Sequence, residues 1–209
     1  MAWEIDQSDK IIIVGYSGAG KSTLLKFFID NYFIKFDNLI IVDPTAKFSF
    51  LEKREYFGVV KCLNPRKNKI CVKLSGENQI EKLISVINRY DKPVFLVVDE
   101  IDGFIPVYFL PYQFGIYSEQ GRNWNQGGIF TVRRIGALNK SIFSNSHYLI
   151  MFKIYNQRDV AYLEQTTDIN VRELIGKLGE HDFFVIDLHF SKVIGHFVVS
   201  GNKLKSLSI

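Results

Sequence analysis

The sequence has few of the residues that build metal centres or disulfide frameworks. Its two cysteines, Cys62 and Cys71, lack the Cys-x-x-Cys spacing of zinc and redox motifs. A disulfide between them stays open at this stage, although two thiols in a reducing compartment are the favoured interpretation. The histidines and cysteines together give no indication of a zinc site. The four histidines are scattered along the second half of the chain, at His147, His181, His189 and His196.

Long apolar runs are also missing, because no stretch approaches the roughly 18 residues that a membrane-spanning helix needs. The first ten residues, MAWEIDQSDK, are polar and acidic, unlike a signal peptide. We therefore expect a soluble protein, inside a cell or inside a particle. The net charge of +4, from 26 basic and 22 acidic residues, is compatible with a polyanionic partner and does not by itself indicate one.

What the sequence does have is an alternation of apolar runs and amphipathic segments. Five buried parallel strands are predicted, at KIIIVG, NLIIVDP, KPVFLVVDEID, IFTVRR and HYLIMFKI. Helices are predicted at KSTLLKFFIDNY, ENQIEKLISVINRY, QRDVAYLEQ and NVRELIGKL, with a short one near FGIYSEQ. Weaker strands, FGVVKCL and KICVKL, flank the basic turn NPRKNK, and DFFVIDLHFSKVIGHFVV predicts a C-terminal β-hairpin. Residues 1–209 are therefore predicted to form a single α/β domain with a mostly parallel sheet flanked by helices.

The segment GYSGAGKST follows the first predicted strand and satisfies the pattern G-x-x-x-x-G-K-[ST]. Glycines let backbone N–H groups converge on a phosphate, and the helix that follows directs its positive end at the same anion. The lysine reaches the β- and γ-phosphates, and the serine hydroxyl holds Mg²⁺. The motif therefore predicts a site for a nucleotide and Mg²⁺, and the absence of a guanine motif described below makes ATP the expected nucleotide. Its expected nucleotide-binding residues are Gly15, Ser17, Gly18, Ala19, Gly20, Lys21, Ser22 and Thr23.

Two acids follow the third buried strand, in VFLVVDE. Asp99 is suited to hold Mg²⁺ together with Ser22, and Glu100 is suited to orient and deprotonate an attacking water. A GTPase would carry N-K-x-D for guanine, but LNKSI has Ile142 where the aspartate should be. A small-molecule kinase usually lacks the second acid. The pair therefore favours ATP hydrolysis by water, with Glu100 and Lys21 as catalytic residues.

The region EQGRNWNQGGIFTVRRIGALNKSIFSNSHYLIMFKIYNQRDVAYL resembles the HerA–FtsK superfamily of DNA-pumping ATPases, over residues 11–163. The similarity is closest to the small genome-packaging ATPases of archaeal turreted icosahedral viruses, relatives of the poxvirus packaging ATPase. This resemblance implies a RecA-like P-loop NTPase, located in the virion or the host cytoplasm. It also implies a homo-oligomeric ring, a hexamer or pentamer, that binds ATP between neighbouring subunits.

The resemblance also implies that an arginine of one subunit completes its neighbour's site. Arg122 matches the family's arginine before the fourth strand, and Arg133 and Arg134 are the second choices. The family commonly has a glutamine at the end of the fourth strand as a γ-phosphate sensor. Val132 stands there in this chain, between Thr131 and Arg133, so the sequence leaves the sensing residue unassigned.

The resemblance implies double-stranded DNA as the partner, held along its phosphate backbone, and a viral capsid vertex or membrane protein as a docking site. The candidate DNA contacts are the basic turn with Arg66, Lys67 and Lys69, and the loop GRNWNQGG with Trp124. The predicted function is an ATP-driven motor that packages viral DNA. Two alternatives stay open: a small-molecule kinase whose acceptor pocket is formed by residues 104–117, and an assembly scaffold that binds nucleotide without hydrolysing it.

Overall fold

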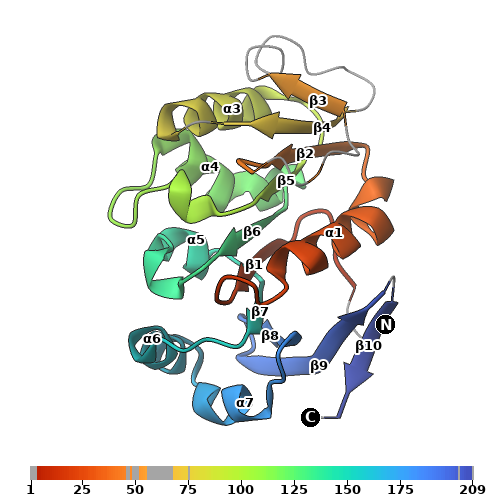
Figure 1. Cartoon of the computed structure of the whole chain (residues 1–209). Coiled ribbons are helices and arrows are strands. Elements are labelled where there is room, and N and C mark those ends of the chain that lie inside the picture. The colour runs from red at the N-terminus through yellow and green to blue at the C-terminus, as the bar shows by residue number, and fades with distance from the viewer. Residues whose placement is uncertain are drawn as a thin grey trace.

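The strands of the protein form one sheet in the computed structural model, which describes residues 4–45, 48, 52–55, 68–74, 76–201 and 203–208. The strand order in this ten-stranded sheet is β10-β9-β8-β7-β1-β6-β5-β2-β4-β3. Neighbouring strands from β3 to β7 in this order are parallel, and β8, β9 and β10 add antiparallel pairs at the other end. Figure 1 shows helices on both faces of the sheet. The predicted α/β class and mostly parallel sheet are confirmed.

The elements alternate along the chain much as the apolar pattern predicts. The strands are β1 (Lys10–Val14), β2 (Asn38–Val42), β3 (Glu52–Glu55), β4 (Asn68–Lys73), β5 (Phe95–Val98), β6 (Gly128–Val132), β7 (Tyr148–Phe152), β8 (Asp182–Asp187), β9 (Lys192–Ser200) and β10 (Lys203–Leu207). The α-helices are α1 (Lys21–Asn31), α3 (Glu77–Arg89), α4 (Tyr112–Gln120), α5 (Lys140–Ser144), α6 (Gln157–Thr167) and α7 (Val171–Lys177). Short 3-10 helices are η1 (Phe33–Lys35), η2 (Ile101–Gly103), η3 (Gly121–Trp124) and η4 (Ile135–Ala137).

Two hydrophobic cores lie on the two faces of the sheet, because successive side chains of a strand point to opposite faces. Ile11 and Ile13 of β1 belong to the core beneath α1, whereas Ile12 and Val14 belong to the core that includes residues of α3 to α7. Figure 1 shows α1 on one side of the sheet and α3 to α7 on the other. Burial of both faces explains why β1 is apolar at four successive positions rather than alternating.

The strand order brings the two motifs together. β6 lies between β1 and β5, with Val14 opposite Val132 and Val98 opposite Phe130. The carboxyl ends of these three parallel strands therefore meet at one edge of the sheet, which is where ligands bind in such sheets. The phosphate loop follows β1, the two acids follow β5, and Arg133 follows β6.

The structure departs from the sequence-based expectations mainly at the two ends of the sheet. The predicted C-terminal hairpin is confirmed as β8 and β9. The largely exposed strand β10 pairs with β9, and the sequence pattern did not predict it. β3 was not predicted either, because its sequence EKRE is charged throughout. The predicted strand FGVVKCL and Cys62 lie outside the described residues, and Cys71 is buried in β4. Among the described residues, no helix has the length and apolar character needed to cross a bilayer.

Candidate nucleotide-binding site

The phosphate loop joins β1 to α1 in a conformation that depends on its glycines. Gly18 and Gly20 have φ values of +91° and +106°, which L side chains rarely adopt. A Cβ atom on Gly15 would lie 2.7 Å from Cβ of Phe152 on β7, closer than atoms can approach. Ala19 is fully buried behind the loop. The loop is therefore preformed, and Ser17, Gly18 and the residues from Gly20 to Thr23 line the pocket.

Lys21 is the first residue of α1 and is 8% exposed. Its Nζ donates hydrogen bonds to the carbonyl oxygens of Gly15, at 2.6 Å, and of Tyr16, at 2.9 Å. Burial lowers the pKa of Lys21, and the nearby Asp99 carboxylate opposes this shift. An ammonium has three donors, so one donor of Lys21 is left for a phosphate oxygen.

The two acids are held by a threonine that sequence reasoning did not assign. Thr131, near the end of β6, donates a hydrogen bond from its hydroxyl to Oδ1 of Asp99, at 2.6 Å. The same hydroxyl accepts the backbone N–H of Glu100, at 2.8 Å. Glu100 has a left-handed backbone with φ of 57°, which is costly for a residue with a Cβ. Thr131 therefore fixes the strained turn that directs the carboxylates of Asp99 and Glu100 into the pocket.

Arg133 belongs to the same pocket as Lys21. Its Nη2 donates to Oε2 of Glu100, at 2.8 Å, and this partner raises the pKa of Arg133. The side chain is 54% exposed, so the pair itself contributes little to folding stability. The arrangement gives the expected water-activating carboxylate a cationic partner from its own chain.

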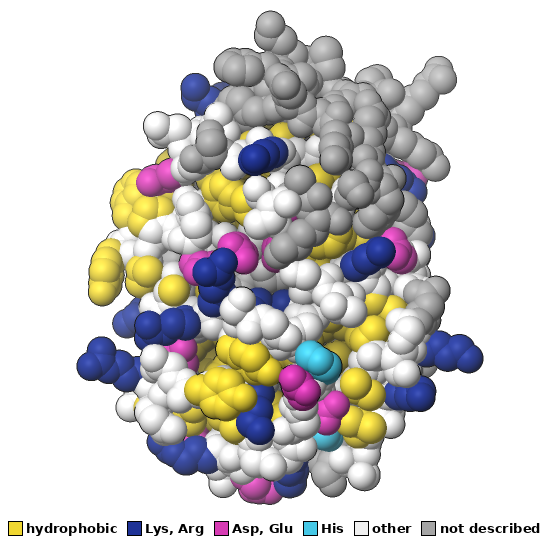
Figure 2. Space-filling view, in the orientation of Figure 1, with side chains coloured by type: hydrophobic (Ala, Val, Ile, Leu, Met, Phe, Trp, Pro, Cys, Tyr) yellow, Lys and Arg dark blue, Asp and Glu magenta, His cyan; other side chains and the backbone are white. Residues whose placement is uncertain are grey.

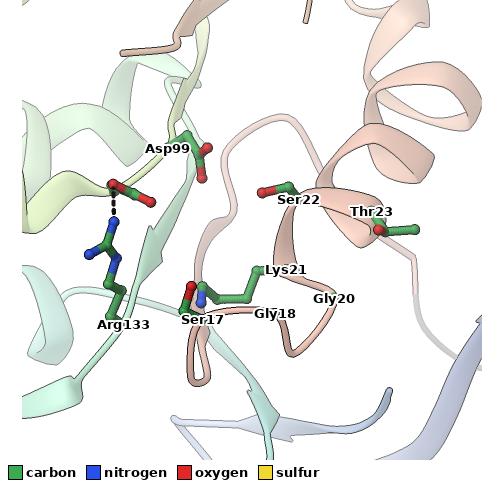
Figure 3. Close-up of a pocket in the computed structure, with 9 residues that line it drawn as sticks. Ser17, Gly18, Gly20, Lys21, Ser22, Thr23, Asp99 and Arg133 are labelled. Carbon is green, nitrogen blue, oxygen red and sulfur yellow. Dashed lines mark hydrogen bonds and ion pairs between the residues drawn. The ribbon is translucent and has the colours of Figure 1, made fainter. Parts of the chain in front are cut away.

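These residues form one open pocket. Figure 3 shows its lining, with the Asp99 carboxylate and the Ser22 hydroxyl facing each other across the space in front of the loop. Figure 2 shows the same region near the centre of the molecule, with acidic and basic side chains at its margin. Oxygen ligands of this kind fit Mg²⁺, which binds proteins through one or two side-chain oxygens and the phosphates of its nucleotide. The pocket lining consists of Ser17, Gly18, Gly20, Lys21, Ser22, Thr23, Asp99, Glu100 and Arg133.

Asp102 is a further acid near this pocket that the sequence did not single out. It lies on η2, and burial raises the pKa of its carboxyl group, although Arg133 and Lys21 are close enough to oppose the shift. Its Oδ1 is enclosed without a hydrogen-bond partner among the described residues. The signal in the sequence was the segment DEID, in which Asp102 follows Asp99 by three positions, about one helical turn.

Arg122 lies far from this pocket. It belongs to η3, before β6, and its charge acts on Asp9, Lys10 and His147 at the amino ends of β1 and β7. The Cα atoms of Lys10 and Val14 are roughly 13 Å apart along β1, at about 3.3 Å per residue. Arg122 is therefore at the opposite edge of the sheet from the phosphate loop of its own chain.

The other basic candidates are dispersed. Arg134 follows Arg133 but turns away from the phosphate pocket, and its Nε lies 3.5 Å from Oδ2 of Asp159. Trp124 of η3 is 43% exposed. Lys69 is half-buried in β4, and the rest of the basic turn, with Arg66 and Lys67, lies outside the described residues.

The aromatic segment 104–117 divides into a buried and an exposed part. Phe104, Phe114 and Tyr117 belong to the core, whereas Tyr108 and Phe109 are 100% and 60% exposed. Figure 2 shows hydrophobic side chains standing out on the side where this loop and α4 lie. None of residues 104–117 is among those lining the phosphate pocket, so the structure gives the acceptor pocket of a kinase no support from this segment.

Comparisons of the sequence found no matching protein-family model and no curated protein of significant similarity. Solved structures do match. The genome packaging NTPase B204 from Sulfolobus turreted icosahedral virus 2, in complex with AMPPCP, has a TM-score of 0.77 and 18% identity, with 90% of this chain and 96% of that chain covered. The chain has a P-loop NTPase fold. This confirms the fold that the resemblance to the HerA–FtsK superfamily implied.

Two further structures support the same P-loop NTPase fold. B204 from Sulfolobus turreted icosahedral virus, described as a DNA-packaging ATPase, has a TM-score of 0.67 and 16% identity over 90% of this chain and 97% of that chain. VirB4 of Thermoanaerobacter pseudethanolicus has a TM-score of 0.60 and 9% identity over 88% of this chain and 90% of that chain. At these identities the likeness concerns the arrangement of the sheet and helices, and the function has to be argued from the site.

Proposed function

We propose that this protein is an ATP-hydrolysing motor that translocates double-stranded DNA into a viral capsid as part of a homo-oligomeric ring. The observation that carries the hydrolytic part is the placement of Glu100 and Asp99 opposite Lys21 and Ser22 in one pocket. The DNA-packaging part is supported by the similarity to packaging NTPases of turreted viruses. Ring assembly at a capsid vertex belongs to the same proposal.

In the proposed reaction, the loop amides and Lys21 bind the β- and γ-phosphates of ATP. Mg²⁺, held by Ser22 and Asp99, would neutralise phosphate charge. Glu100 accepts a proton from a water whose oxygen attacks the γ-phosphorus. The bond from the γ-phosphorus to the bridging oxygen breaks, and ADP and inorganic phosphate leave.

Arg133 is proposed to sense the γ-phosphate, in the place of the glutamine that related enzymes have on this strand. Its guanidinium is bonded to Glu100 at 2.8 Å within the same pocket that the phosphates would enter. A phosphate is a strong competitor for a guanidinium. Nucleotide binding would therefore draw Arg133 toward the γ-phosphate and leave Oε2 of Glu100 available to the water.

Glu100→Gln tests this assignment, because the substitution keeps the shape of the side chain and removes its ability to take a proton. We expect the variant to bind ATP with unchanged affinity and to release phosphate at least about 100-fold more slowly, the lower range of general-base contributions. Turnover equal to that of the unmodified protein would show that Glu100 is not the base.

The motor itself is tested by phosphate release with and without linear double-stranded DNA, at low and moderate salt. DNA should stimulate turnover, and added salt should weaken the stimulation, because contacts to the phosphate backbone release counterions. Arg122→Ala should abolish the stimulated turnover if Arg122 completes a neighbour's site. Turnover that is indifferent to DNA would refute the motor, and nucleotide-driven assembly without phosphate release would favour the scaffold.

A further inference from the structure

A buried lysine at the amino edge of the sheet has no use in the reaction described so far. Lys10 is the first residue of β1 and only 2% exposed. Its backbone is satisfied, since its N–H donates to Nδ1 of His147 and its carbonyl accepts the N–H of His147. Within the described part of the chain, however, its ammonium has no hydrogen bond or ion pair. A largely desolvated charge without a partner is costly, so its presence calls for an explanation outside the isolated subunit.

Arg122 is the charged group whose electrostatic interaction changes the pKa of Lys10. Both burial and Arg122 lower the pKa of Lys10, to about 8, so the ammonium is still mostly protonated at neutral pH. Arg122 is exposed on η3 and has no ion pair among the described residues. Gly121 connects the two, because a Cβ atom built on it would lie 3.7 Å from Cε of Lys10. The lysine therefore lies directly beneath the turn that displays the arginine.

The surroundings compensate only one of these two cations. Arg122 interacts favourably with the Asp9 carboxylate, but Asp9 is not among the groups that act on the Lys10 ammonium. His147 is neutral, since burial lowers its pKa to about 4. Arg122 and Lys10 repel each other, and an anion that contacts both would reverse that cost.

We propose that Lys10 and Arg122 together form a phosphate-binding pair that receives the terminal phosphate of the nucleotide held by a neighbouring copy of this chain. The inference rests on the proposed ring, and it adds Lys10 as a second residue acting between subunits. The phosphate loop of the same chain is excluded as the source of the phosphate, because it lies at the other edge of the sheet. A ring is built from one repeated head-to-tail contact between two different surfaces of the subunit. The proposal assigns the phosphate-loop edge of one subunit and the amino edge of its neighbour to that contact.

The first test is Lys10→Met, which keeps the length of the side chain and removes its charge. We expect turnover to fall about tenfold to 100-fold, as for loss of a hydrogen bond to a charged group. The affinity of the isolated subunit for ATP should stay unchanged, and Tm should rise by about 2–4 °C or more because an unpaired buried charge is lost. Lys205→Met, on the exposed face of β10, is the matched control and should change neither property. A lower Tm with normal turnover would make Lys10 a structural residue and overturn the proposal.

The second test mixes two variants whose turnover is impaired for different reasons. Lys21→Met subunits cannot bind nucleotide but present an intact Lys10, and Lys10→Met subunits have an intact phosphate loop. In a ring mixed at equal amounts, about a quarter of the sites would join an intact loop to an intact Lys10, since each subunit contacts one neighbour in this way. Turnover well above the sum of the two separate variants supports a role between subunits. No gain on mixing refutes it, whatever the stability of the variants.

The phosphate that Lys10 and Arg122 bind could instead belong to the DNA backbone. A measurement of DNA binding distinguishes this alternative from the nucleotide of a neighbouring subunit. If Lys10 contacts DNA, Lys10→Met should weaken DNA binding and reduce its salt dependence while leaving DNA-free turnover intact. That result would overturn the nucleotide assignment. If the proposed motor function is wrong, the unmodified protein itself will lack DNA-stimulated turnover. That result differs from failure of the Lys10 assignment, which appears only in the variants.

Discussion

Replacing Thr131 with valine removes a single hydroxyl that connects the two acids of the site. Valine matches threonine in shape and suits a buried strand, so the packing of β6 should be preserved. Two hydrogen bonds disappear, one to Oδ1 of Asp99 and one from the N–H of Glu100. A bond to a charged group contributes about 1.5–3 kcal/mol, and a buried N–H left unsatisfied costs about 1–3 kcal/mol. We therefore expect Thr131→Val to lower the free energy of unfolding by about 2.5–6 kcal/mol.

The effect on turnover should be larger than the effect on nucleotide affinity. Without the Thr131 hydroxyl, the backbone N–H of Glu100 loses its partner. Among the described residues, the left-handed backbone of Glu100, with φ of 57°, is then held only by the bond from the N–H of Gly103 to its carbonyl and by the Arg133 side chain. A displacement of about 1 Å at a reacting group can cost about 100-fold in rate. The loop that binds the phosphates is unchanged, so ATP affinity should stay within about threefold, and the loss should fall on kcat.

The assay is single-turnover phosphate release, with ATP affinity measured separately and both at a temperature below the Tm of the variant. Thr131→Ser is the control, because it keeps the hydroxyl and loses only a methyl group, at about 1 kcal/mol of stability. Serine should retain most of the turnover and valine should not. Equal turnover in the two variants would show that the Thr131 hydroxyl does not position Glu100.

Two further predictions concern the loop and the amino edge of the sheet. Gly20→Ala should weaken ATP binding by about fivefold to 30-fold, because a φ of +106° costs an L-residue on the order of 1–2 kcal/mol. Titration with an ATP analogue checks this, and unchanged affinity would contradict a preformed loop. His147 has its pKa lowered from 6.5 to about 4, first by burial and then by His189, Lys10 and Arg122, with Asp187 opposing. The unfolded chain therefore takes up the proton first as the pH falls, and about 3 kcal/mol of stability should be lost between pH 6.5 and pH 4. Denaturation at pH 7 and pH 4.5 should show this loss, and His147→Asn should show less of it; an equal loss in both would assign the effect to other groups.

The phosphate loop and the acids could be predicted because their signals are local. Gly15 to Thr23 form a contiguous motif whose backbone geometry is dictated by its glycines, and Asp99 and Glu100 directly follow an apolar strand. The order of the sheet follows less directly from the sequence. Only the pairing of β6 with both β1 and β5 brings Thr131 and Arg133 between the loop and the acids.

The residues that the sequence analysis missed are those whose roles depend on contacts distant in the chain. Thr131 is one of several hydroxyl residues near strand ends, and its two bonds span 31 and 32 positions. Lys10 gave no signal, because a lysine before an apolar run is ordinarily an exposed strand end. It is buried here because η3 and Gly121 cover it from a segment more than a hundred residues away. Burial without a partner became visible only in three dimensions.

The charges of the pocket indicate why a single subunit is an incomplete enzyme in this proposal. Among the ionisable residues that act on Lys21 there are three acids, Asp99, Glu100 and Asp102, and one further cation, Arg133. Formally the three acids outnumber Lys21 and Arg133 by one negative charge, before any phosphate enters. The triphosphate adds more negative charge than one Mg²⁺ removes, and charge on the transferred group has to be stabilised as the bond to the leaving oxygen breaks. Within the described part of the chain, the pocket lining supplies only the cations Lys21 and Arg133, while Lys10 and Arg122 have no ion pair at the opposite edge of the same sheet. A head-to-tail contact between subunits would satisfy both edges at once, which couples each step of hydrolysis to the geometry of the ring.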